Sequence, residues 1–255
     1  MKKFLVRVTL FLFAAFICAT LLDVFLSSRL LKNKNRIFAS LNQIYTDSTD
    51  YDLVINGSSR AWVQYDPIII DSILAINSYN LGFNGSGINR QIVKYNKYCE
   101  LHENPKYLIQ NIDLWTMAIT RGYEREQFFP YFIYDRNLIK VIDKYENFSL
   151  AEKYIPCYRY LGYKDVLLEA LFEDNRKHWF EFSTKGYWGN NGVWNGDDLA
   201  KLDSVSCSCD TTAVRLFVDF LEQTTSNGTK VLFVYAPVYH EVRTKMINEH
   251  QMYKM

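Results

Sequence analysis

The sequence predicts an α/β protein that a single N-terminal helix ties to a membrane. Short apolar runs that end in glycine or polar residues alternate with stretches of helical periodicity, a pattern typical of a parallel sheet with helices on both faces. An apolar N-terminal stretch lies behind a positively charged flank, as in proteins that cross a membrane once. With 255 residues, 49% of them hydrophobic, the chain is long enough for one large domain with an insertion.

The N-terminal stretch has the length and charge of a signal-anchor. Lys2, Lys3 and Arg7 precede an apolar run over residues 8–22, which Asp23 interrupts. With the neighbouring apolar residues counted, the run approaches the ~20 residues that a bilayer-spanning helix needs. The positive flank is expected to stay in the cytoplasm, so the rest of the chain is expected on the extracytoplasmic side, periplasmic or extracellular.

We therefore expect an uncleaved transmembrane anchor over residues 1–27 and a solvated juxtamembrane linker over 28–50. A cleaved signal peptide and a buried helix are the alternatives for the first segment. The net charge of +1 and the absence of a basic stripe give no sign of nucleic-acid binding. The cysteines show no zinc pattern, so neither a metal nor a cofactor is expected.

The predicted domain over residues 51–255 opens with strands and helices in alternation. Asp66 suits a helix N-cap and Pro67 the first helical position. Apolar runs predict strands over residues 52–56, 76–81 and 106–113. Helical spacing of apolar residues predicts helices over 66–74 and 88–102. A helix over 211–225 and a strand over 230–236 restore this rhythm near the end of the sequence.

Residues 122–206 interrupt the alternation and are rich in aromatic, glycine and asparagine residues. We interpret them as an insertion that covers one edge of the sheet, because a long excursion in a compact α/β domain is often a lid or binding loop. The whole pattern predicts a three-layer, flavodoxin-like parallel sheet with helices on both faces, joined to a transmembrane helix and an aromatic-rich insertion.

Ser59 is the candidate nucleophile. It follows a predicted buried strand on the tight turn formed by residues 56–60, Asn-Gly-Ser-Ser-Arg. Ligands of parallel sheets bind beyond the carboxyl ends of the strands, and a serine held rigidly there can approach a carbonyl group while backbone N–H groups face the developing oxyanion. The alternative is an ordinary turn serine that caps the next helix.

Three short blocks resemble those of the SGNH (GDSL-like) hydrolase superfamily. Residues 57–59 read Gly-Ser-Ser where the family has Gly-Asp-Ser, and residues 80–85 match its Asn-x-x-x-x-Gly block. Residues 110–113 read Gln-Asn-Ile-Asp where the family has Gly-x-Asn-Asp. The resemblance covers roughly residues 50–116 and 228–238, and the departures are similar to those of divergent membrane-anchored esterases and acyltransferases.

The resemblance implies roles for four residues at the strand ends. Ser59 would be the nucleophile and the N–H group of Gly85 would line the oxyanion hole. Asn111 would join the oxyanion hole only if the end of the third strand is shifted; otherwise it is a plain polar residue. Asp113 would orient the loop after Ser59 or bind substrate. The implied partners are the membrane, a glycan substrate and a membrane acyl-donor protein.

The family's histidine base arrives on an Asp-x-x-His block, which this sequence does not contain. Three explanations stay open. The chain is a piece of a longer protein that carries the block, or it is a catalytically inactive, envelope-tethered glycan-binding or scaffold protein, or His240 serves as a substitute base. The first explanation predicts an extracytoplasmic esterase or O-acyltransferase that acts on acyl esters of envelope or exported glycans. The second predicts a protein that is not an enzyme.

Weaker candidates for substrate binding are Arg60, Trp188 and Trp194. Arg60 flanks the turn of the candidate nucleophile and could hold an anionic group, although most such arginines are structural. The two tryptophans lie in the Gly/Asn-rich part of the insertion. They would either stack on sugar rings or anchor the insertion onto the sheet.

Overall fold

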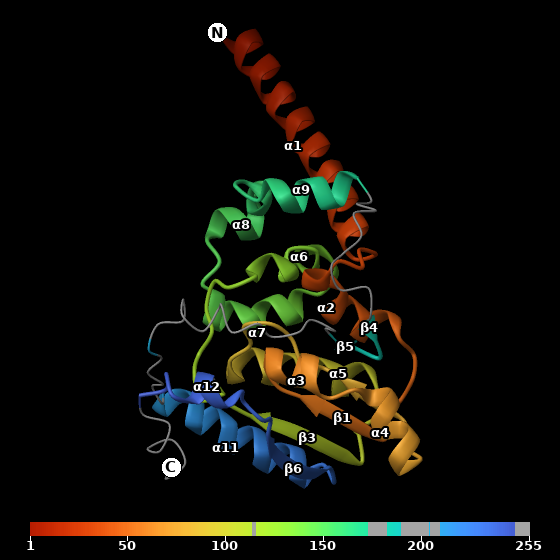
Figure 1. Ribbon diagram of the computed structural model, residues 1–255. Coiled ribbons are helices and arrows are strands. Elements are labelled where there is room, and N and C mark those ends of the chain that lie inside the picture. Colours follow the sequence, from red (N-terminus) through yellow and green to blue (C-terminus); the bar gives the residue numbers. More distant parts are fainter. Residues whose placement is uncertain (114–115, 173–182, 190–203, 205–209, 248–255) are drawn as a thin grey trace. The chain divides into compact units, whose positions relative to one another are not determined.

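The computed structural model describes residues 1–255 except 114–115, 173–182, 190–203, 205–209 and 248–255. The chain divides into two compact units. Figure 1 labels the helices and strands of each. The anchor unit comprises Met1–Asn42 and Glu124–Arg176, and the sheet unit comprises Gln43–Tyr123 and Lys177–Met255.

The sheet unit holds the predicted strand–helix alternation. Its described elements, in chain order, are β1 (Leu53–Asn56), α3 (Ser59–Gln64), α4 (Pro67–Leu74), β2 (Ser78–Asn80), α5 (Ile88–Leu101), β3 (Tyr107–Ile112), β4 (Ser183–Thr184), β5 (Tyr187–Trp188), α11 (Thr211–Ser226), β6 (Lys230–Tyr235) and α12 (His240–Arg243). The Asp66 carboxylate accepts a hydrogen bond from the Ile68 N–H at 2.9 Å, which confirms the predicted N-cap of α4.

The main sheet of the described chain has the strand order β2-β1-β3-β6, and each pairing is parallel. In the centre of the sheet, Leu53 of β1 lies opposite Ser78 of β2 on one side and Tyr107 of β3 on the other. Because the strands are parallel, their carboxyl ends lie at the same edge, and the segments that follow β1, β2 and β3 meet there. The parallel α/β sheet that the sequence predicts is therefore confirmed.

Successive side chains of a strand face opposite sides of the sheet. On one side, Leu53 and Ile55 of β1 pack with Ala61 of α3 in a buried cluster, against which Ile70 of α4 also packs. Burial of these aliphatic groups fixes the start of α3 directly beyond the end of β1, where the candidate nucleophile is found.

Helix α5 contacts both β3 and α11. The side-chain amide of Gln110 in β3 donates to the side-chain oxygen of Gln91 in α5 at 2.9 Å. Farther along α5, the rings of Tyr95 and Phe220 of α11 meet edge to face with centroids 5.2 Å apart. Polar and aromatic contacts thus hold α5 in place.

The two edges of the described sheet differ. At the β2 edge, the carbonyl of Lys185, in the turn of the β4–β5 hairpin, accepts from the Asn80 N–H at 2.9 Å. Gly186 permits this approach, because a Cβ there would lie 2.0 Å from the Asn80 carbonyl oxygen. At the β6 edge, Leu232 and Phe233 are 60% and 50% exposed.

The anchor unit is helical in its described residues. Its elements are α1 (Lys2–Leu30), α2 (Arg36–Thr46, whose last turn belongs to the sheet unit), η1 (Arg125–Phe128), α6 (Tyr131–Tyr134), α7 (Arg136–Glu146), α8 (Leu150–Tyr154), η2 (Tyr158–Tyr160) and α9 (Lys164–Leu171). The first part of α1 is exposed and apolar, and α1 is long and apolar enough to cross a membrane. This feature supports anchoring of the chain to a membrane.

The last two turns of α1 are packed inside the anchor unit. Asp23, Leu26, Ser27 and Leu30 are buried there. Asp23 forms a two-pronged ion pair with the guanidinium of Arg159, and one of its N–H···O contacts measures 2.8 Å. The residue that interrupts the apolar run is thus half of a buried charge pair.

The structure adds detail to two segments for which the sequence predicts a linker and an insertion. Part of the predicted linker over 28–50 is α2, because Phe38, Leu41 and Ile44 recur at helical spacing and are buried. Within the predicted insertion over 122–206, the described residues 124–172 belong to the same unit as α1, whereas the β4–β5 hairpin belongs to the sheet unit. The ion pair between Arg159 and Asp23 joins residues 124–172 to α1.

Candidate active site

The segments that follow β1, β2 and β3 are joined by hydrogen bonds at the carboxyl edge of the sheet. The Phe83 N–H, after β2, donates to the Gly57 carbonyl, after β1, at 3.4 Å. A Cβ on Gly82 would lie 2.6 Å from the Trp62 nitrogen, so glycine is required for this close approach to α3. The turn that carries Ser59 and the loop that carries Gly85 are therefore adjacent.

Ser58 is a structural serine of the turn. It is 4% exposed, and its hydroxyl donates a hydrogen bond to the Asp113 carboxylate beyond β3. The same hydroxyl accepts from the Arg60 N–H at 3.3 Å and caps α3. Burial and these two bonds leave Ser58 unsuited to attack a substrate.

Ser59 differs from Ser58 in both respects. It is the first residue of α3 and is partly exposed. Within the part of the chain that the structure describes, neither its hydroxyl nor its N–H group has a hydrogen-bond partner. Of the two adjacent serines, Ser59 is therefore the one with a hydroxyl open to a ligand.

Gly85 lies on the neighbouring loop in the left-handed conformation, with φ +61°. A Cβ at this position would lie 2.2 Å from the ring of Tyr123, so the ring closes over the glycine. The Gly85 N–H has no hydrogen-bond partner among the described residues. An unpaired backbone N–H on a loop next to Ser59 is the kind of donor that an oxyanion hole requires.

Asn111 is held away from such a role by its own bonds. It is fully buried; its side-chain oxygen accepts from the Tyr65 hydroxyl at 2.9 Å, and its amide nitrogen donates to the Asp113 carboxylate at 3.3 Å. Burial and the nearby Asp113 charge raise the pKa of Tyr65 to about 12, so this phenol remains a donor at neutral pH. Of the two roles weighed for Asn111, the structure favours that of a structural polar residue.

Asp113 is the hub of this hydrogen-bonded cluster. It is 3% exposed and takes bonds from Ser58 and Asn111, while its N–H donates to the Thr116 hydroxyl at 2.8 Å. Contact with Ser58 places Asp113 behind the turn of Ser59. Of its two predicted roles, orienting the loop fits this position better than binding substrate.

Asn80, which opens the second family-like block, fastens the loop after β2 to α3. Its amide nitrogen donates to the carbonyls of Ala61 at 2.8 Å and Tyr65 at 2.9 Å, and its side-chain oxygen accepts from the Gly82 N–H at 2.8 Å. Every polar atom of the side chain is thus engaged in holding the start of the Gly85 loop.

A row of buried amides behind the strand ends was not predicted from the sequence. The Asn56 amide donates to Gln110 at 3.0 Å, Gln110 donates to Gln91 at 2.9 Å, and Gln91 donates to the Ser86 carbonyl at 2.7 Å. The row ends next to Gly85 and supports its loop. Its signal in the sequence is the placement of Asn56 and Gln110 in otherwise apolar strands, where a polar side chain needs a buried partner.

Lys94 of α5 is a second residue that sequence reasoning missed. It is 4% exposed, its Nζ lies 4.5 Å from the centre of the Phe83 ring, and Nζ donates to the Leu81 carbonyl at 2.8 Å. Burial lowers the pKa of Lys94 well below the ordinary value, because water no longer solvates the charged form. Lys94 therefore braces the loop after β2 from the α5 side.

The remaining predicted site residues lie around this edge or outside the described chain. Arg60 is partly buried beside Ser59, and one of its terminal nitrogens is buried without a hydrogen-bond partner in the described structure. Trp188 is 3% exposed with its ring 5.1 Å from that of Trp62, which fits the anchoring role rather than sugar stacking. Trp194 lies outside the described residues.

His240 begins α12 after β6 and is exposed. No hydrogen bond or ion pair joins its side chain to another described residue. No contact with Ser59 therefore supports its predicted role as a substitute base. The other described histidine, His102, is bonded to the Ile44 carbonyl at 2.9 Å and stacked on Tyr98. It is a structural residue of the sheet unit.

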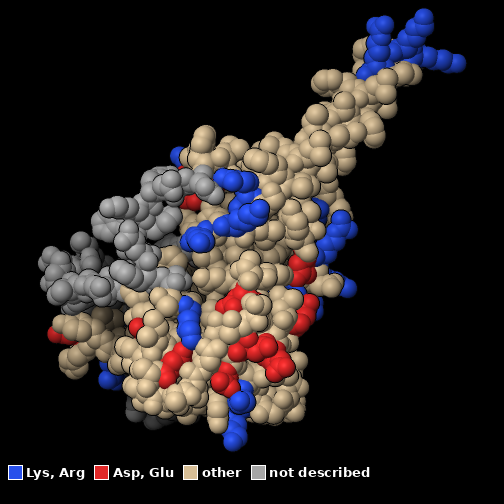
Figure 2. All heavy atoms as spheres, turned by 90° about the vertical axis from the view of Figure 1, so that its right-hand side faces the viewer, with Lys and Arg blue, Asp and Glu red and all other residues tan. Residues whose placement is uncertain are grey.

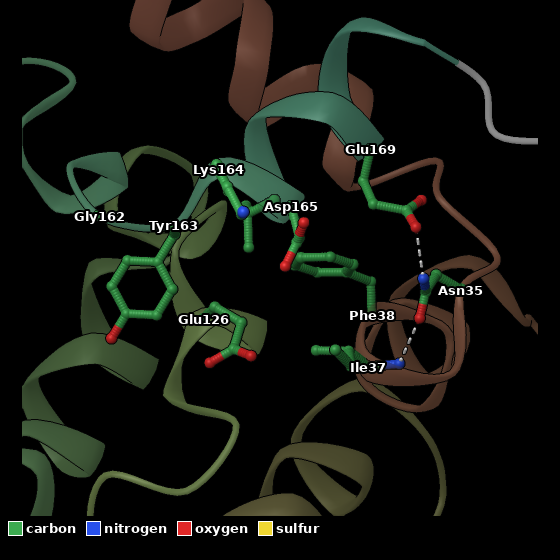
Figure 3. A pocket seen from close by; sticks show the side chains of 10 residues that line it. Asn35, Ile37, Phe38, Glu126, Gly162, Tyr163, Lys164, Asp165 and Glu169 are labelled. Atoms are coloured by element: carbon green, nitrogen blue, oxygen red, sulfur yellow. Dashed lines mark hydrogen bonds between the residues drawn. The ribbon is translucent and has the colours of Figure 1, made fainter.

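A hollow of about 260 Å³ lies within the anchor unit and contains none of the predicted site residues (Figure 3). Glu126, Asp165 and Glu169 line it with Lys164 and the ring of Phe38. Glu169 is already bonded to Asn35 at 2.7 Å. Among the residues that the structure describes, no group of three or more acidic, histidine or cysteine side chains is arranged to hold a metal ion.

Comparisons with protein-family models, with curated proteins and with solved structures give no match for this chain.

Proposed function

We infer that the chain is an extracytoplasmic serine esterase or O-acyltransferase that acts on acyl esters of envelope or exported glycans through Ser59. One observation carries this proposal. At the carboxyl edge of a parallel sheet, the hydroxyl and N–H of Ser59 and the N–H of Gly85 lack hydrogen-bond partners among the described residues, while the side chains of Ser58, Asn111 and Asp113 behind them are bonded to one another. A nucleophile and two oxyanion donors are two of the three parts of a serine acyl-transfer site, and the third is a base.

The proposed fold is a three-layer, flavodoxin-like sheet. The order β2-β1-β3-β6 corresponds to the first four positions of the 2-1-3-4-5 order of such sheets. The cluster of Leu53, Ile55 and Ala61 on one side and the Gln110–Gln91 bond to α5 on the other support helices on both faces. In this fold the crevice beyond β1 and β3 is the usual place for a ligand.

In the proposed reaction, the Ser59 oxygen attacks the ester carbonyl and its proton passes to a base. The N–H groups of Ser59 and Gly85 stabilise the negative oxygen that forms, and the alcohol leaves with a proton from the same base. The acyl group then passes from Ser59 to water or to a glycan hydroxyl. His240, which begins α12 after β6 and is exposed, is our proposal for this base.

Labelling by a fluorophosphonate probe tests the nucleophile. We expect the full chain in detergent micelles to be labelled and Ser59→Ala to lose the label. Ser72→Ala, which removes an exposed helix hydroxyl on α4, is the matched control and should keep it. Equal labelling of Ser59→Ala and the unmodified chain contradicts the proposal. Loss of labelling in His240→Gln would support the base assignment.

A non-catalytic alternative, an envelope-tethered glycan-binding or scaffold protein, is favoured by one observation. Neither described histidine contacts Ser59, and the sequence contains no Asp-x-x-His block. A serine without its base loses most of its activation. Under this alternative the unmodified chain takes no label, and its affinity for an acylated polysaccharide is unchanged in Ser59→Ala.

A further inference from the structure

One surface of the anchor unit exposes apolar side chains close to the membrane-spanning part of α1. We call it the α8–η2 surface and define it by Leu150, Tyr154, Ile155, Tyr158 and Leu161. Leu150 and Tyr154 are 73% and 75% exposed, and Leu161 is 66% exposed. Large side chains at such exposure, gathered within one short segment, mark a surface that binds something apolar.

The charged side chains of the same segment are paired with partners elsewhere in the anchor unit. The ion pairs are Glu152 with Arg125 at 3.1 Å, Lys153 with Asp143 at 2.5 Å, and Arg159 with Asp23. The segment thus reverses the arrangement of a water-exposed surface, in which charges face solvent and apolar groups turn inward. Its tyrosines add a polar tip to an apolar ring, a combination favoured at membrane interfaces.

Hydrogen bonds place this segment at a definite level along α1. The Cys157 N–H donates to the Asp23 carboxylate at 3.0 Å, and the Cys157 thiol donates to the Ala19 carbonyl at 3.3 Å. Ala19 precedes Asp23 by about 6 Å along the helix axis, at 1.5 Å per residue. The turn between α8 and η2 therefore lies beside the last turn of the apolar run.

The apolar run has the dimensions of a bilayer core. Counted from Phe4 to Leu22, with Arg7 the one charged residue among them, the run spans about 28 Å as a helix, close to the ~30 Å of hydrocarbon. Figure 2 shows basic side chains gathered at the free end of α1 and an uncharged surface along the helix below them. With the run in the hydrocarbon, Ala19 to Asp23 lie at its boundary with the headgroups, and so does the segment bonded to them.

We propose that the α8–η2 surface is a second membrane contact, seated in the lipid–water interface of the leaflet from which the end of α1 emerges. Its occupant is the phospholipid bilayer that holds α1, because Cys157 joins this segment to Ala19 in the apolar run of that helix. The anchor unit is then held by two contacts, which fixes its tilt on the bilayer. A tether at α1 alone would leave that tilt free.

Photocrosslinking to lipid tests this contact in the full chain reconstituted into phosphatidylcholine vesicles. A benzoylphenylalanine replaces Tyr154 or Leu161 in separate variants, and mass spectrometry detects crosslinks to lipid. Tyr134 of α6, which is 48% exposed in the same unit, is the matched control, and Phe11 of α1, 72% exposed, reports on the anchor itself. These positions are exposed, so the replacements leave the packing intact.

We expect lipid crosslinks at positions 154 and 161 several-fold above those at 134, and as evident as those at 11. Crosslinks at 11 with positions 154 and 161 at the level of 134 overturn the proposal. Crosslinks from 154 or 161 to a second copy of the chain also overturn it, since the surface would then be a self-contact. Absence of lipid crosslinks at 11 removes the membrane anchor and with it the second contact.

Discussion

The Ser58 hydroxyl donates a hydrogen bond to the Asp113 carboxylate, and this bond ties the turn after β1 to the end of β3. Asp113 also accepts a hydrogen bond from the Asn111 amide. The side-chain oxygen of Asn111 in turn accepts one from the Tyr65 hydroxyl. The turn that exposes Ser59 is therefore held from behind by a buried, hydrogen-bonded cluster. Preorganisation of this kind is what a nucleophile at a strand end needs.

Removal of the Ser58 hydroxyl should weaken the fold without removing the nucleophile. Ser58→Ala leaves the buried Asp113 carboxylate short of a donor and takes away the cap of α3, so we expect a loss of about 1–3 kcal/mol in the free energy of unfolding. Ser72→Ala, on the exposed face of α4, should change it by less than about 0.5 kcal/mol. Urea unfolding in micelles compares the two, and equal stabilities would show that the buried bond contributes nothing.

Gly85 should tolerate no side chain while Tyr123 lies over it. Gly122 also has a positive φ, +73°, but a Cβ there meets nothing within 4 Å. Gly122→Ala therefore carries only the left-handed backbone cost of about 1–2 kcal/mol, whereas Gly85→Ala adds a clash with the Tyr123 ring. Combining Gly85→Ala with Tyr123→Ala should restore part of the loss in a thermal unfolding series. Equal losses in the two alanine variants would argue against the close contact.

Loss of one partner of the Asp23–Arg159 pair should destabilise the anchor unit. Asp23→Ala leaves a buried guanidinium without its carboxylate, and we expect a cost of about 3–5 kcal/mol. Asp165→Ala, which removes an exposed carboxylate from α9, is the control. Replacing both partners, as Asp23→Leu with Arg159→Met, should recover much of the stability. Limited proteolysis between residues 124 and 172 measures the unfolding, and cleavage rates that do not differ between Asp23→Ala and Asp165→Ala would contradict the prediction.

The stability gained by replacing Lys94 should depend on pH. Burial lowers the pKa of Lys94 in the folded state below the ~10.5 of the unfolded chain, so folding releases a proton between these two values. As the pH falls from about 10 towards 7, the unmodified chain loses stability relative to Lys94→Met, by up to ~1.4 kcal/mol per pH unit.

Comparison of the unmodified chain with Lys94→Met separates the pH dependence due to Lys94 from that due to Cys99. Burial raises the pKa of the Cys99 thiol to about 11, which makes stability fall with rising pH in both proteins alike. Chemical unfolding at pH 7, 8, 9 and 10 measures the difference. Lys140→Met on the exposed face of α7 serves as control. A Lys94→Met difference that stays constant across this range would show that Lys94 is solvated in the folded protein.

Much of the secondary structure could be predicted because its signals are local. The apolar runs of β1, β3 and β6 and the Asp66-Pro67 start of α4 were correctly placed, since strand burial and helix capping depend on residues within a few positions of one another. The signal of the serine turn is also local, because a glycine and two serines directly follow a buried strand.

The sequence could not show which contacts join distant segments. Ser58 and Ser59 are adjacent serines on the same turn. The hydrogen bond from Ser58 to Asp113, 55 residues away, makes Ser58 structural and leaves the Ser59 hydroxyl open. In the sequence, Asp23 only interrupts an apolar run. In the structure it pairs with Arg159, 136 residues later. Periodicity reports which face of an element is buried, whereas the partner on that face is selected by packing of the whole chain. The sequence by itself therefore determined the parallel α/β class, the apolar anchor and the serine turn, and the tertiary structure decided the pairing of charges, amides and hydroxyls, because a buried polar group is stable only where the fold supplies its partner.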